Sequence, residues 1–124
     1  MNAKEKALPY DRLRHLLEYN PHTGDFFWKS PRKRIQVGQI AGGPHGGGYW
    51  IIQIRDIHGK MYKYKAHRLA FFYCYKRWPY PQVDHIDGNR LNNRIANLRE
   101  CTVSENIQWG WDRRKRGNNT IEGL

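Results

Sequence analysis

The sequence has few cysteines, few acidic residues and no long hydrophobic run. Its two cysteines, Cys74 and Cys101, exclude a scaffold of several disulfides and a four-cysteine zinc site. No apolar stretch approaches the roughly 20 residues that a membrane-spanning helix needs. No apolar segment of the kind found in secretory signals follows the first residues. These absences predict a cytoplasmic protein with reduced thiols and no membrane partner.

Basic side chains outnumber acidic ones two to one. The 124 residues include 22 lysines and arginines against 11 aspartates and glutamates, which gives a formal net charge of +11. Aromatic residues make up 14% of the chain, which favours a packed core over a disordered basic tail. A folded basic domain attracts phosphates, and each neutralised phosphate releases condensed counterions. Composition therefore favours a nucleic-acid partner, and a ribosome-associated or merely basic protein is the alternative.

Apolar spacing predicts the elements of the first half of the chain. Leu13, Leu16 and Leu17 follow an i, i+3, i+4 pattern, which predicts a helix over residues 11–19. Residues 49–66 alternate between apolar and basic side chains, which predicts a β-hairpin with one apolar and one basic face. The other expected segments are a strand at 26–28, a basic loop at 30–34, a glycine-rich flexible loop at 42–48 and a buried helix at 67–77.

Residues 82–106 contain the side chains that suggest chemistry. A short strand is expected to end at Asp84 and His85 and to lead into an asparagine-rich loop, after which the chain extends again. Thr102 and Glu105 have the spacing of a capping box, which predicts that a helix begins there. The predicted order of this segment is therefore strand, loop, strand, helix.

One divalent cation could be bound where this helix meets the strands. Asp84 offers a carboxylate, and Asn106, in the first helical turn, offers an amide oxygen; both are hard donors suited to Mg²⁺ or Mn²⁺. His85 could serve as a general base because imidazole titrates near neutrality. Neighbouring strand residues point to opposite faces, so Asp84 and His85 can address one phosphate only if the strand bends or ends there. The alternative is a plain loop without a site.

The positions Asp84-His85, Asn97 and Asn106 resemble the motif of the HNH endonuclease family in its His-Asn-Asn variant. The 11 and 8 intervening residues and the flanking sequence resemble small HNH endonucleases of phages and group I introns. This resemblance implies an α+β fold with a ββα-metal motif, in which two strands and a helix hold one divalent ion. It also implies that Asp84 and Asn106 bind the metal, that His85 activates water, and that Asn97 bridges the loop and helps to orient His85.

The resemblance further implies hydrolysis of double-stranded DNA inside a bacterial host cell by a phage- or intron-encoded protein. We expect residues 1–78 to form a supporting region that contacts DNA, residues 79–112 the nuclease motif, and residues 113–124 a basic tail. The end of the tail resembles the opening of a DNA-binding module, so a minimal nuclease and a truncated one both fit. A monomer would nick one strand and a homodimer would cut both, and a phage packaging partner remains open. The alternative functions are a non-catalytic DNA-binding module and an RNA-binding basic protein.

Basic side chains in four segments are the candidates for contacts with DNA phosphates. Such contacts supply affinity and register but do not select a sequence. The candidates are Arg32, Lys33 and Arg34 in the basic loop, Arg55, Lys63 and Lys65 on the hairpin, Arg90 and Arg94 in the motif, and Arg113 and Arg114 in the tail.

Overall fold

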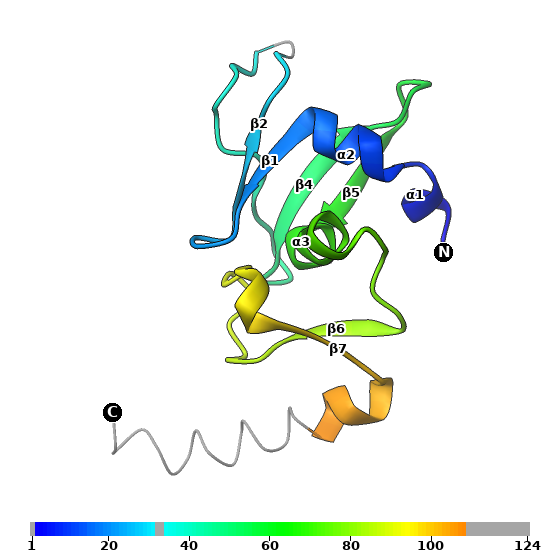
Figure 1. The fold of residues 1–124 in the computed structure, drawn as a ribbon, viewed down its shortest axis with the longest axis vertical. Helices are drawn as coiled ribbons and strands as arrows, with labels where there is room; N and C mark the ends of the chain where they lie inside the picture. The colour runs from blue at the N-terminus through cyan, green and yellow to red at the C-terminus, as the bar shows by residue number, and fades with distance from the viewer. Residues whose placement is uncertain (1, 32–33, 109–124) are drawn as a thin grey trace.

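The computed structural model describes residues 2–31 and 34–108, and its arrangement of elements is shown in Figure 1. The labelled helical segments are α1 (Ala3–Lys6), α2 (Tyr10–Leu16), α3 (Ala66–Tyr75) and the 3₁₀ turn η1 (Ile95–Asn97). The strands are β1 (Leu17–Asn20), β2 (Asp25–Trp28), β3 (Gly43–Pro44), β4 (Trp50–Arg55), β5 (Met61–Lys65), β6 (Gln82–His85) and β7 (Leu98–Cys101). Residues 103–108 are helical and follow β7.

The strands form three small antiparallel sheets around helix α3. Strands β1 and β2 pair as one hairpin, β3, β4 and β5 form a second sheet, and β6 pairs with β7. Helix α3 contacts β4 and β5 on one side and β6 and η1 on another, so it lies between the central sheet and the β6–β7 pair (Figure 1). The fold is α+β, as the sequence predicts.

Helix α3 contributes much of the apolar core. Leu69, Ala70, Phe71 and Phe72 are buried, and Trp78 stacks on Phe72 with 4.2 Å between ring centroids. The helix ends where Lys76 adopts a left-handed conformation with φ of 61° and donates its backbone N–H to the Phe72 carbonyl. The helix predicted from the apolar run is therefore present, with both ends within two residues of the expected positions.

The hairpin predicted over residues 49–66 is also present. Ile52 pairs with Tyr64 and Ile54 with Tyr62, which places the apolar side chains on one face of β4 and β5. Ile52, Ile54 and Tyr64 are buried, whereas the lysines of β5 are exposed on the other face. Period-two alternation was sufficient to predict this arrangement.

Two predictions about the N-terminal half are right only in part. The helix expected over residues 11–19 ends at Leu16, and β1 begins at Leu17. Leu17 and Tyr19 are buried and the residue between them is exposed, which is the alternation of a strand. They pair with Trp28 and Phe26, so a strand forms in place of the last helical turn. The glycine-rich segment expected to be a flexible loop also contains the short strand β3, which pairs with β4.

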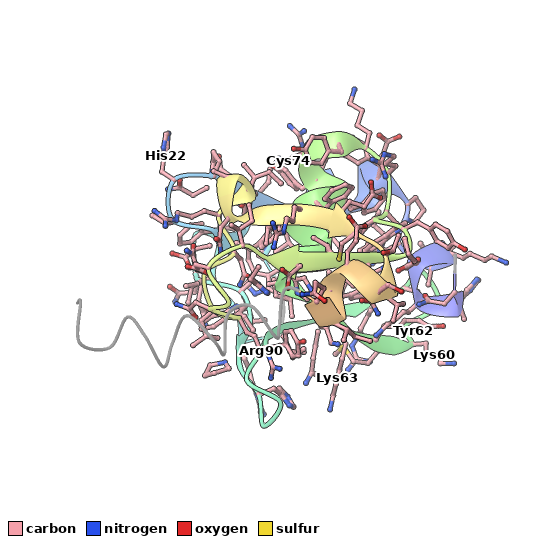
Figure 2. All side chains as sticks on the ribbon, turned by 90° about the horizontal axis from the view of Figure 1, so that it is seen from below. His22, Lys60, Tyr62, Lys63, Cys74 and Arg90 are labelled. Atoms are coloured by element: carbon pink, nitrogen blue, oxygen red, sulfur yellow. The ribbon has the colours of Figure 1, made fainter. Side chains whose placement is uncertain are left out.

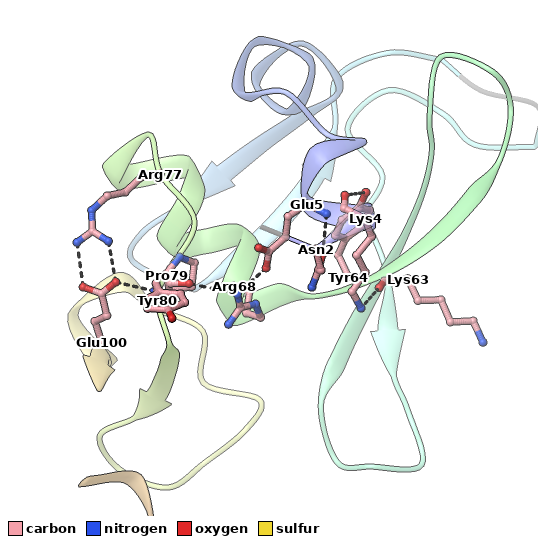
Figure 3. A network of polar contacts seen from close by, with 10 residues as sticks. All are labelled: Asn2, Lys4, Glu5, Lys63, Tyr64, Arg68, Arg77, Pro79, Tyr80 and Glu100. Atoms are coloured by element: carbon pink, nitrogen blue, oxygen red, sulfur yellow. Dashed lines mark hydrogen bonds and ion pairs between the residues drawn. The ribbon is translucent and has the colours of Figure 1, made fainter. Parts of the chain in front are cut away.

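Arg68 of α3 and Arg77, which lies just after the end of α3, bind acidic residues that are distant in the sequence (Figure 3). Arg68 binds the buried carboxylate of Glu5 in α1 and also donates to the Pro79 carbonyl. Arg77 makes a bidentate pair with Glu100 of β7, with distances of 2.6 and 2.9 Å. Arg68 thus ties α1 to α3, and the Arg77–Glu100 pair fixes β7 against the segment that follows α3.

Glu100→Gln should lower the thermal stability of the protein at neutral pH. The hydrogen bond and charge of Arg77 hold the pKa of Glu100 below its usual value of 4.5, so the folded state favours the ionised carboxylate. This contribution is present above pH 4.5 and is lost as the pH falls through the lowered folded-state pKa. We expect a fall in Tm of roughly 2–4 °C at pH 7. The difference from wild type should disappear in calorimetry at acidic pH, and a pH-independent difference would contradict the ion-pair explanation.

Across residues 2–31 and 34–108, no helix combines the length and the apolar character that crossing a membrane requires.

Candidate active site

Strand β6 ends at the residue that was predicted to be the general base. Asp84 pairs with Arg99, and His85 pairs with Leu98 as the last pair of the β6–β7 ladder. The chain then turns away, with the Gly88 N–H bonded to the His85 carbonyl. Because the strand ends there, the side chains of Asp84 and His85 can both reach one site, although neighbouring residues within a strand point to opposite faces.

The helix after β7 begins as predicted. The Glu105 N–H donates to Thr102 Oγ1 at 3.1 Å, and the Thr102 N–H donates to Glu105 Oε1 at 3.0 Å, which is a reciprocal capping box. Asn106 lies in the first turn of this helix and donates its side-chain amide to Gln82 Oε1 at 2.8 Å. The amide group of Asn106 therefore points back to strand β6.

The side chains of Asp84, His85 and Asn106 line one small polar pocket. The pocket has a volume of about 140 Å³, and its lining includes Asp84, His85 and Asn106 together with Tyr49, His67 and Arg90. Asp84 and His85 are buried, with 7% and 4% of their surface exposed. The structure thus brings the amide of Asn106 to the adjacent acid and imidazole, from which it is separated in the sequence by the loop and strand β7.

The electrostatics of the pocket keep the His85 imidazole neutral at neutral pH. Burial lowers the pKa of His85, and the hydrogen bond to Asn93 and the charge of Asp84 oppose this shift without reversing it. The Asp84 carboxylate lies 3.5 Å from Arg99 of β7. A neutral imidazole can accept a proton from water, which is the state that a general base requires.

A second histidine lies beside His85. The ring of His67, at the start of α3, is 4.6 Å from the ring of His85 and stacks on Tyr49 at 5.4 Å. Burial and the neighbouring His85 lower the pKa of His67 to about 2, so this ring is also neutral. Its approach to His85 depends on the packing of α3 against β6, which no local sequence pattern indicates.

Asn97 shapes the loop that follows His85. Its amide nitrogen donates to Asp87 Oδ1 and to the Asn92 carbonyl, both at 2.9 Å, and its amide oxygen accepts from the Asp87 N–H at 3.1 Å. Its backbone carbonyl also accepts from the Ile86 N–H. The side-chain partner seen on the His85 ring is Asn93, whose Oδ1 lies 2.8 Å from His85 Nε2. No local sequence signal distinguishes Asn93, because the loop contains several asparagines of similar local chemistry.

The basic candidates lie at different distances from this pocket. Arg90 lines it, and its guanidinium lies 4.8 Å from the centre of the Tyr49 ring, whereas the Lys65 ammonium lies 4.4 Å from the same ring. Arg94 lines a separate hollow with His22. In Figure 2, Arg90 and Lys63 lie on one side of the molecule and His22 on the opposite side.

The remaining basic candidates line a different groove or lie outside the described residues. Arg34 and Arg55 line a broad groove of about 1090 Å³ over the β3–β4–β5 sheet, together with Arg12. Arg32, Lys33, Arg113 and Arg114 lie outside the residues that the structure describes.

The donor set of the pocket fits a hard divalent cation. The amide nitrogen of Asn106 is used by Gln82, which leaves its oxygen as the donor, and Asp84 adds a buried carboxylate. Within the described part of the chain, no three His, Cys, Asp or Glu side chains are grouped as a metal site. A cation here would therefore need oxygens from water and substrate in addition to Asp84 and Asn106, and such an all-oxygen set suits Mg²⁺ or Mn²⁺.

Comparison with known proteins identifies the class to which this arrangement belongs. The family model described as HNH endonuclease matches residues 64–108, the segment from the end of β5 to the helix that contains Asn106. Residues 64–108 of this chain are therefore a segment of the HNH endonuclease type.

Individual proteins are also similar to this chain. Protein 3.8 of Escherichia phage T7 is 31% identical over 98 residues, which are 79% of this chain and 54% of that protein. An uncharacterised HNH endonuclease of Acanthamoeba polyphaga mimivirus is 32% identical over 83 residues, which are 64% of this chain and 21% of the relative. The chain thus spans about half or less of the length of these relatives.

A solved structure shares the fold. A structure that describes DNA binding and cleavage by the HNH homing endonuclease I-HmuI matches with a TM-score of 0.57 and 25% sequence identity. The match covers 82% of this chain and 53% of the I-HmuI chain. The match therefore extends well beyond residues 64–108 and includes part of the chain before residue 64.

Proposed function

We propose that this protein is a divalent-metal-dependent endonuclease that hydrolyses phosphodiester bonds of double-stranded DNA. The observation that carries the proposal is the convergence of Asp84, His85 and Asn106 on one polar pocket of about 140 Å³. The match of residues 64–108 to the HNH endonuclease family and the similarity to an HNH homing endonuclease support the same reaction. The relative from an Escherichia phage supports action inside an infected bacterial cell.

Each of the three side chains has a proposed role. Asp84 and Asn106 would hold the divalent ion, which would supply Lewis-acid polarisation of the scissile phosphate and charge stabilisation at the leaving oxygen. The neutral imidazole of His85 removes a proton from water, and the resulting hydroxide attacks phosphorus in line with the departing 3′ oxygen. Asn97 keeps the loop after His85 in shape. The products would have 5′-phosphate and 3′-hydroxyl ends.

The edge of the pocket supports binding of the phosphate backbone. Lys65 and Arg90 both lie against Tyr49, which itself lines the pocket beside His67. Arg90 is held in place by a hydrogen bond from its guanidinium to the Gly47 carbonyl at 2.8 Å. Two cations beside the pocket would hold phosphates next to the scissile one and would supply affinity without sequence preference.

Replacing Lys65 and Arg90 with alanine should weaken binding to duplexes of unrelated sequence by similar factors. The slope of log Kd against log salt should fall by about one for each side chain removed. Fluorescence anisotropy at several salt concentrations measures both quantities. Arg94→Ala should have a smaller effect, since Arg94 lines a separate hollow. Equal losses for Arg94 and Arg90 would show that the DNA path does not follow this pocket.

Supercoiled plasmid provides the test of the proposed function. Wild-type protein is incubated with plasmid and Mg²⁺, Mn²⁺ or a chelator, and His85→Ala is treated in parallel. We expect metal-dependent nicked or linear product from the wild type only. Nicked circles would indicate cleavage of one strand, and linear product would indicate cleavage of both strands by two events or by a dimer.

The same assay separates the alternatives. A non-catalytic DNA-binding module would bind duplex equally well with and without chelator and would cut no strand. An RNA-binding basic protein would prefer structured RNA to duplex DNA in competition binding, and Asp84 would not be required. Either result would overturn the proposed endonuclease activity.

A further inference from the structure

The hydrogen bond between His85 and Asn93 determines which nitrogen of the imidazole has the lone pair. Asn93 Oδ1 lies 2.8 Å from His85 Nε2, and both side chains are buried at 4% exposure. An amide oxygen can only accept a hydrogen bond, so Nε2 must carry the hydrogen. In the neutral ring, Nδ1 is then the nitrogen that can accept a proton from water.

The backbone of Asn93 is held from its other side by the β1–β2 hairpin. The hydroxyl of Tyr19, on β1, donates to the Asn93 carbonyl at 2.5 Å in a buried contact. Gly24, in the turn between β1 and β2, approaches the same peptide so closely that a Cβ there would lie 2.6 Å from the Asn93 carbonyl carbon. The hairpin therefore contacts Asn93 at two points (the hairpin and the loop are neighbours in Figure 1).

The side chain of Tyr19 is itself fixed by packing. Its ring lies 4.8 Å from the ring of Phe26 and 5.7 Å from that of Tyr73. Tyr19 is 7% exposed, and Phe26 is among the most completely buried side chains. The hydroxyl thus has little freedom to leave the Asn93 carbonyl.

We infer that Asn93 is a positioning residue that fixes the orientation and tautomer of the His85 ring, and that the β1–β2 hairpin holds Asn93 in place through Tyr19 and Gly24. This inference rests on the proposed role of His85 as general base. The hairpin lies before residue 64, outside the segment that matches the family model, so a part of the chain beyond the motif supports the reacting group. Asn97 acts differently, because its amide bonds to Asp87 and Asn92 and so shapes the loop.

Two substitutions of Asn93 provide the main test. Asn93→Leu keeps the size of the side chain but removes the acceptor, whereas Asn93→Asp keeps an acceptor oxygen. Removing the partner that fixes a catalytic histidine can cost orders of magnitude in kcat. We expect Asn93→Leu to lower kcat for plasmid cleavage by about 10²-fold with KM for DNA unchanged. Asn93→Asp should recover activity to within about tenfold of wild type, because its carboxylate still accepts from Nε2.

The tautomer can be observed without any DNA or cleavage. The ¹⁵N chemical shifts of the His85 ring in the full chain distinguish a hydrogen on Nε2 from one on Nδ1. Wild type and Asn93→Asp should show the Nε2–H form, and Asn93→Leu should show a mixture of both forms. An unchanged Nε2–H signal in Asn93→Leu would overturn the inference.

The contribution of the hairpin is tested with gentler substitutions. Tyr19→Phe removes only the hydroxyl, and we expect kcat to fall by about 3- to 10-fold with unchanged KM. Gly24→Ala should lower kcat more than Tyr19→Phe does, because the added methyl must displace the Asn93 peptide. Gly38→Ala is its matched control: Gly38 has a similar φ of +88° against +81°, but nothing lies within 4 Å of its added Cβ. If Asn93→Leu does not fold, Tyr19→Phe with full kcat and Gly24→Ala equal to Gly38→Ala would still overturn the inference.

The outcomes separate this inference from the proposed function. If His85→Ala cleaves plasmid at the wild-type rate, the general base is wrongly assigned whatever the Asn93 variants do. If His85→Ala is inactive while Asn93→Leu retains full kcat, the endonuclease activity stands and the positioning role is overturned.

Discussion

His85→Ala should slow plasmid cleavage by about 10²–10⁴-fold while leaving the affinity for DNA within about twofold of wild type. A positioned general base typically contributes a factor of this size to the rate. The His85 side chain is buried at the end of β6, whereas the cations proposed to bind phosphates, Lys65 and Arg90, come from other positions in the chain. Single-turnover rates measured with saturating protein would separate the chemical step from binding.

His58→Ala is the matched control for this substitution. His58 is exposed in the turn between β4 and β5, so its replacement removes an imidazole that has no part in the pocket. It should cleave at the wild-type rate. Cleavage by His85→Ala at that same rate, with correct folding confirmed by circular dichroism, would contradict the assignment of His85.

Asp84→Asn should reduce cleavage by about 10³-fold and should raise the Mn²⁺ concentration needed for half-maximal activity. The substitution keeps the shape of the side chain but removes the only carboxylate that lines the pocket among the described residues. Metal assistance to phosphoryl transfer is worth several kcal/mol, which corresponds to factors of this order. A titration of cleavage rate against Mn²⁺ concentration measures both effects.

The change in net charge needs its own control, because removing an acid from a protein of charge +11 can also alter DNA binding. Glu18→Gln removes one negative charge from an exposed position on β1. Its metal titration should superimpose on that of the wild type. If Asp84→Asn gave the same curve as Glu18→Gln, Asp84 would not be a metal ligand.

Features with a local physical cause could be predicted from the sequence. The capping box depends on two residues three positions apart, and both of its hydrogen bonds form as expected. The faces of the β4–β5 hairpin follow from alternation alone. The convergence of Asp84, His85 and Asn106 could be predicted because a spacing shared with a known family fixes their relative places. Family resemblance supplied the long-range information that local patterns lack.

Features that depend on distant packing could not be predicted. Leu13, Leu16 and Leu17 fit a helical stripe, but Leu17 belongs to a strand because Trp28 is available to pair with it. The loop after β6 contains several asparagines with similar local chemistry: Asn89 caps a turn by accepting from the Leu91 N–H, whereas Asn93 contacts His85. Only the folded position of the loop decides which asparagine faces the imidazole.

The packing of α3 limits the transfer of the nuclease motif to other proteins. Leu69 and Phe72 are buried within a core to which Leu13, Ile52 and Leu98 also belong, so the helix is shared between the motif and the rest of the fold. Transplanting residues 64–108 onto another scaffold would carry over the acid, the imidazole and the amide. It would also expose the apolar face of α3 to water. Each Å² of apolar surface exposed lowers the free energy of unfolding by about 25 cal/mol. Transfer of the motif to another scaffold would therefore require a surface equivalent to the β4–β5 sheet against which α3 could pack.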